Sequence, residues 1–129
     1  MLPLNVLADN DRAVIIDWEC AGILPYPCAL VRFLAYSGET PDYMYRISGE
    51  DREFAAQYYY EKLIMNKGIS HDEYIRTLRL FFLKEYSEWI CYARENHDTA
   101  HPEYQKYYEK CRTLAEELGF AGKPAGEGK

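Results

Sequence analysis

The sequence NVLADNDRAVIIDWECAG, residues 5–22, decides the fold at the start of this chain. Two short apolar segments flank the polar residues DND at 9–11, a pattern typical of a β-hairpin. We expect this hairpin over about residues 4–17. It puts Asn5 at the start of one strand and Asp17 at the end of the other. The two side chains are therefore predicted to face one point.

An amide and a carboxylate oxygen at one point suit Mg²⁺, which prefers hard oxygen ligands and takes few of them from the protein. Kinase-type enzymes use such an Asn and Asp to hold Mg²⁺ against nucleotide phosphates. Asn5 and Asp17 are thus candidate metal ligands, and Glu19 is a candidate to support them. Each residue also has a purely structural alternative. Asn5 could form a hydrogen bond with its own backbone, Asp17 could accept hydrogen bonds from loop N–H groups, and Glu19 could anchor the loop.

The same stretch resembles the aminoglycoside phosphotransferase and choline-kinase-like families. Their catalytic loop reads roughly His-Gly-Asp-x-x-x-x-Asn-Ile/Val-Leu, followed by a hairpin and then Ile-Asp-Trp/Phe-Glu. Asn5 matches the loop Asn and Asp17 matches the metal-binding Asp, while DWECAG at 17–22 looks like the family's DWE-x-AG. The next segment departs from the family, because Cys28 stands where the pattern Pro-x-x-Asp-Leu-Ala has its Asp.

The resemblance implies the C-terminal lobe of an enzyme that moves a phosphoryl group from ATP or GTP, with Mg²⁺, to a small-molecule hydroxyl. The family's general base is an Asp five residues before the loop Asn, a position that precedes Met1. The phosphate-pairing Lys and the N-terminal lobe also have no counterpart in these 129 residues. No catalytic residue is therefore assigned, and the chain alone is expected to be inactive.

The alternative is a non-catalytic helical interaction module that binds a protein partner or forms a homo-oligomer. An exposed apolar surface near the hairpin would favour it, because contiguous apolar patches usually mark interaction sites. We expect Leu2, Leu4 and Val6 to contribute to that surface.

Helical signals dominate the rest of the chain. We expect helices over about 28–36, 51–67 and 71–95, and a last helix from Pro102 to Gly119. Ser48 with Asp51, and Ser70 with Glu73, have the three-residue spacing of helix-capping pairs. The predicted fold is mainly α with a small N-terminal β-hairpin, one domain over 1–120 and a flexible tail over 121–129.

Apolar residues at helical spacing predict which faces are buried. The longest stripe predicts a central helix with Phe82 and Trp89 largely buried. The expected faces are Leu30, Phe33 and Leu34 in the first helix, Ile75, Leu78, Phe82, Tyr86, Trp89 and Ala93 in the third, and Tyr104, Tyr108, Cys111, Ala115 and Leu118 in the last.

Composition narrows the functional classes. A hydrophobic content of 48% predicts a globular chain, and a net charge of −6 without a basic stripe argues against nucleic acid as partner. No apolar run reaches the length of a membrane span. The four cysteines have no C-x-x-C spacing and are interpreted as free thiols of a cytoplasmic protein. His97 and His101 flank a helix break and are not assigned a metal.

Overall fold

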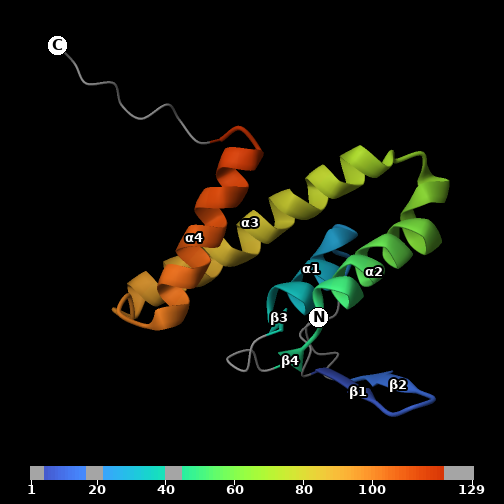
Figure 1. Ribbon diagram of the computed structural model, residues 1–129, viewed down its shortest axis with the longest axis horizontal. Coiled ribbons are helices and arrows are strands. Elements are labelled where there is room, and N and C mark those ends of the chain that lie inside the picture. Colours follow the sequence, from blue (N-terminus) through green and yellow to red (C-terminus); the bar gives the residue numbers. More distant parts are fainter. Residues whose placement is uncertain (1–4, 17–21, 40–44, 121–129) are drawn as a thin grey trace. The chain divides into compact units, whose positions relative to one another are not determined.

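The structure, a computed structural model, describes residues 5–16, 22–39 and 45–120. It is mainly helical, with four α-helices and a small antiparallel hairpin of two strands (Figure 1). This confirms the predicted fold class at that level. Among the residues described, no helix is both long and apolar enough to cross a membrane.

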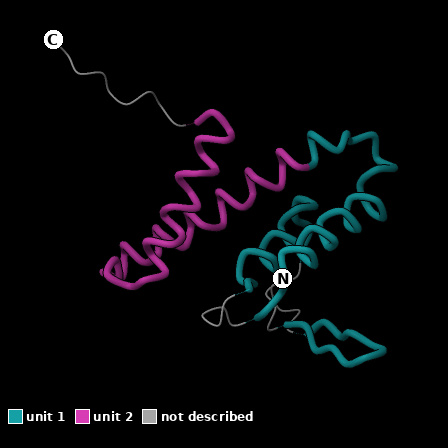
Figure 2. The backbone as a smooth tube through the Cα atoms, viewed as in Figure 1, with its two compact units in different colours: residues 1–74 teal, residues 75–129 magenta. Residues whose placement is uncertain are grey.

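The chain divides into two compact units, residues 1–74 and residues 75–129 (Figure 2). The boundary falls inside helix α3 (His71–Glu95), whose first turn belongs to the first unit. The single domain expected over residues 1–120 stays a prediction.

The hairpin consists of β1 (Val6–Ala8) and β2 (Ala13–Ile15), which pair antiparallel with Leu7 opposite Val14. Its turn is held by Asp9, whose Oδ1 accepts hydrogen bonds from the N–H groups of Asp11 at 2.9 Å and Arg12 at 2.8 Å. The Asp9 N–H also donates to the Arg12 carbonyl at 2.9 Å. The polar turn predicted at 9–11 is thus confirmed, and its carboxylate fixes the local backbone.

The Asp9 turn should loosen in acid. Hydrogen bonds from the backbone of Asp11, and next of Arg12, lower the pKa of Asp9 below its ordinary value of 3.8. A carboxyl whose pKa is depressed by folding stabilises the turn above its unfolded pKa, and that contribution is lost as the pH falls through the folded pKa. In an NMR titration, the amide signals of Asp11 and Arg12 should shift with a midpoint below 3.8. A midpoint at or above that value would contradict the turn geometry.

Helix α1 (Pro27–Ala35) begins with a proline, whose fixed φ and missing N–H suit the first helical position. Leu34 is buried as predicted, together with Val31 and Ala35, all at most 2% exposed, whereas Leu30 and Phe33 are half-buried. The helix ends before the predicted stop at Gly38. That residue instead belongs to β3 (Ser37–Gly38), which pairs in parallel with β4 (Tyr45–Arg46).

Helix α2 (Gly49–Tyr59) starts as predicted at Ser48, whose Oγ accepts from the Asp51 N–H at 3.0 Å. Side chains of α2 form hydrogen bonds with the backbone at both ends of α1. Arg52 Nη1 donates to the carbonyls of Leu34 and Ser37, both at 2.6 Å. The Tyr59 hydroxyl donates to the Tyr26 carbonyl at 2.6 Å. Since Arg52 is near the start of α2 and Tyr59 at its end, the two helices run antiparallel.

The predicted helix over 51–67 is not regular throughout. A π-helical turn, Tyr60–Ile64, follows α2, and a 3-10 turn, Met65–Lys67, follows that. Gly68, with φ of 77°, ends the run at the predicted place, because glycine enters the left-handed region without steric cost. The Tyr60 hydroxyl donates to the Ile69 carbonyl at 3.1 Å and closes this connection.

In the second unit, α3 packs along α4 (Pro102–Glu117). The Tyr107 ring lies 5.2 Å from the Tyr86 ring and 4.9 Å from the Trp89 ring, centroid to centroid. Arg79, earlier on α3, pairs with Glu117 at the end of α4, with 3.6 Å between Nε and Oε2. The helices are therefore antiparallel.

Phe82 and Trp89 are only partly exposed, which agrees with their predicted burial. The predicted buried face of α4 was wrong in one respect. On α4 the buried aromatic residue is Tyr107, at 3% exposed, while Tyr108 is 49% exposed. One step along a helix turns a side chain by about 100°, so adjacent tyrosines face different surroundings.

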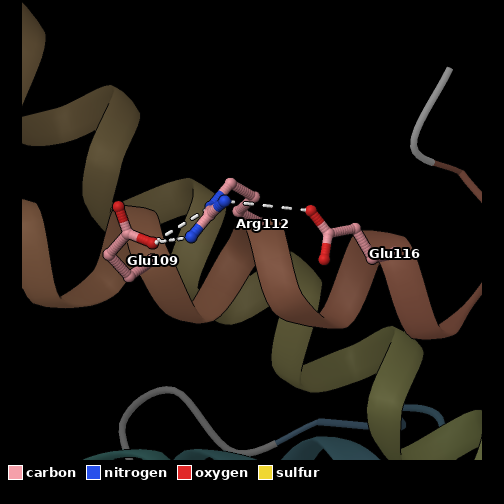
Figure 3. A network of polar contacts seen from close by, with 3 residues as sticks. All are labelled: Glu109, Arg112 and Glu116. Atoms are coloured by element: carbon pink, nitrogen blue, oxygen red, sulfur yellow. Dashed lines mark hydrogen bonds and ion pairs between the residues drawn. The ribbon is translucent and has the colours of Figure 1, made fainter. Parts of the chain in front are cut away.

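The face of α4 opposite to Tyr107 carries a charged network of Glu109, Arg112 and Glu116 (Figure 3). Arg112 Nη2 lies 2.6 Å from Glu109 Oε2, and Arg112 Nη1 lies 4.0 Å from Glu116 Oε1. The hydrogen bonds that Arg112 donates to the Glu109 carboxylate raise the pKa of Arg112 above its ordinary value. These side chains are more than half exposed, so the network marks the solvent face of α4 and stabilises it little.

Candidate functional site

Asn5, the first candidate ligand, lies directly before β1. Its carbonyl accepts a hydrogen bond from the Ile16 N–H at 2.9 Å, so it continues the strand pairing by one step. The residue is half-buried and its Oδ1 atom is shielded from solvent. An amide oxygen turned inward at this point is a hard donor of the kind that suits Mg²⁺.

Asp17 and Glu19, the other two candidates, lie outside the described residues. The described pairing ends with Ile16 opposite Asn5, and Asp17 is the next residue in the sequence. The convergence of Asn5 with Asp17 therefore stays a prediction. Within the described ranges, no three His, Cys, Asp or Glu residues group closely enough to hold a metal ion.

The two histidines near the break between α3 and α4 have roles at the helix ends. His97 follows α3 with a φ of 57°, in the left-handed region typical of helix C-termini. His101 precedes α4, and its Nδ1 accepts from the Glu103 N–H at 3.2 Å.

The hairpin exposes apolar side chains other than Val6, the one predicted contributor that the structure describes. Leu2 and Leu4 lie outside the described residues, and Val6 is half-buried. The exposed apolar residues, which we call the hairpin patch, are Leu7, Val14, Ile15 and Ile16. The cross-strand pair of Leu7 and Val14 is 58% and 56% exposed. Neighbouring residues in a strand point to opposite faces, so the patch extends over both faces of the hairpin.

A buried acid on α3 did not enter the predicted site. Glu85 is only 6% exposed, whereas Glu88 is exposed and its Oε1 lies 2.7 Å from Lys84 Nζ. Glu85 is three residues after Phe82 and four before Trp89, so it lies within the apolar stripe. This spacing was the available sequence signal for its burial.

The three described cysteines, Cys28, Cys91 and Cys111, are free thiols, as predicted for them. Burial raises the pKa of Cys111 above its ordinary value, with a smaller contribution from Cys91. A raised pKa disfavours the thiolate, the reactive form of cysteine. Cys111 is half-buried, and its Sγ lies 3.9 Å from the Leu83 carbonyl oxygen of α3.

Comparison with known proteins gives no match to a family model, a curated protein or a solved structure.

Proposed function

We propose that this chain supplies the C-terminal lobe of a phosphotransferase similar to the aminoglycoside phosphotransferases and choline kinases. In this proposal, Asn5 and Asp17 bind the Mg²⁺ that accompanies ATP or GTP, and the acceptor is a hydroxyl of a small molecule. The order of elements, a hairpin followed by helices, supports the proposal.

The observation that carries the proposal is the hydrogen bond from the Ile16 N–H to the Asn5 carbonyl. It shows that the strands remain paired up to the residue directly before Asp17. The tight turn at Asp9 fixes the register, because it sets which residues of the two strands face each other. Asn5 thus belongs to a short, locally determined element, and Asp17 follows the last described residue of that element in the sequence.

The role of this lobe would be to position the metal ion and the phosphoryl group rather than to react with them. Bound Mg²⁺ neutralises charge on the transferring phosphoryl group. Asn5 would offer an amide oxygen and Asp17 a carboxylate, while Glu19 would restrain the loop that carries Asp17. The acceptor hydroxyl also needs a general base, and none of the residues named here is proposed for that role.

Reading the coding DNA upstream of Met1 in frame tests this proposal. We expect a His-Gly-Asp-x-x-x-x-Asn motif ending at Asn5, preceded by a lobe with a phosphate-pairing lysine. The longer protein should consume ATP or GTP in a Mg²⁺-dependent manner, whereas the 129-residue chain should not. Asp17→Ala in the longer protein should abolish turnover, and Asp11→Ala at the hairpin tip should not. Upstream sequence without the motif, or turnover by the short chain, would overturn the proposal.

A second candidate function is favoured by the hairpin patch. An isolated two-stranded hairpin is only marginally stable in water. In this hairpin, more than half of the surface of both Leu7 and Val14 is exposed to solvent. Covering such a surface is favourable by about 25 cal/mol per Å² of apolar area removed from water. The alternative is therefore an interaction module that associates with a second copy through the hairpin.

Light scattering over a wide concentration range tests self-association. If it occurs through the hairpin patch, the apparent mass of the wild-type chain should rise with concentration. Replacing both Leu7 and Val14 with Thr, which keeps the β-propensity, should then give a monomer. Tyr92→Gln removes a 65% exposed aromatic side chain elsewhere and is the matched control. A wild-type chain that stays monomeric throughout would contradict this alternative.

A further inference from the structure

We draw no further inference here: the strongest candidate, the exposed aromatic face of helix α2 formed by Phe54 and Tyr58, carries nothing because nothing in the structure shows what covers it.

Discussion

Replacing Tyr74 with alanine should lower the free energy of unfolding by about 3–5 kcal/mol, the range for truncating a buried aromatic residue. Tyr74 is fully buried at the first turn of α3, where its ring lies 5.1 Å from the Tyr60 ring and 6.3 Å from the Tyr26 ring. The substitution removes these contacts and leaves a cavity. Because domains are stable by only about 5–15 kcal/mol, a large part of the stability would be lost.

The hydroxyl of Tyr74 adds a smaller, separable contribution. It donates to the Ala56 carbonyl at 2.7 Å, and burial raises the pKa of Tyr74, so the donor stays protonated at neutral pH. Tyr74→Phe should therefore cost only about 0.5–1.5 kcal/mol, the net value of one hydrogen bond. Urea denaturation followed by circular dichroism measures both variants. Tyr92→Ala, at an exposed position of α3, is the control and should change stability by no more than about 0.5 kcal/mol.

The second large effect is expected at Tyr107, in the other unit. Tyr107→Ala should cost about 3–5 kcal/mol, because a buried aromatic ring is removed from between two helices. Tyr107 packs against Tyr86 and Trp89 of α3, and aromatic pairs contribute about 0.5–1.5 kcal/mol beyond their burial. Lys110 Nζ also lies 5.5 Å from the Tyr107 ring centroid.

The adjacent tyrosine provides a matched control for this prediction. Tyr108 has the same helix propensity as Tyr107 but is 49% exposed, with the Tyr104 ring 6.4 Å away. Tyr108→Ala should therefore cost less than about 1 kcal/mol, since only a weak surface contact is lost. Thermal denaturation of the two variants measures the difference. Equal destabilisation by Tyr107→Ala and Tyr108→Ala would contradict the packing of α4 on α3 through Tyr107.

Several helix ends were predictable because their signals are local. Ser70 caps α3, accepting from the Glu73 N–H at 3.2 Å, and the helix spans the predicted residues 71–95. Gly68 and Pro102 mark boundaries for equally local reasons, a left-handed φ and a missing N–H. Each of these residues acts on its own backbone, so no knowledge of tertiary packing is needed.

The choice of buried residues depends on packing and was less predictable. Tyr107 and Tyr108 have identical side chains, and only the position of α3 decides which one is covered. On α1, packing likewise decides that Val31 is buried while the adjacent Leu30 is only half-buried. The parallel pairing of β3 with β4 joins residues separated by a connection, with only two residues in each strand. Strands this short leave no periodic pattern in the sequence.

The candidate site could be predicted in part. The hairpin and its polar turn follow from the alternation of apolar and polar segments, and Asn5 lies directly before β1, next to its expected place at the strand start. The identity of the exposed apolar residues did not follow, because the sequence shows that Leu7 and Val14 are apolar but not that both faces of the hairpin stay open. Asp17 and Glu19, beyond the described pairing, remain predictions.

If Asn5 and Asp17 form one metal site as proposed, their side-chain oxygens must lie roughly 3–4 Å apart, because Mg–O bonds are near 2.1 Å and the ligands are octahedral. Two protein ligands bind a metal ion only weakly, so the ion must be detected in solution at excess. Mn²⁺ takes the same oxygen ligands as Mg²⁺ and is paramagnetic, which makes it a suitable probe. Its effect on amide NMR signals of the 129-residue chain reports where the ion lies.

We predict that Mn²⁺ broadens the amide signals of Asn5 and Ile16 before those of the hairpin tip, which is about 13 Å away at 3.3 Å per residue. Excess Mg²⁺ should reverse the broadening, and Asp17→Ala should abolish it, whereas Asp11→Ala should leave it unchanged. Broadening that is strongest at Asp11, or that persists in Asp17→Ala, would contradict the shared site.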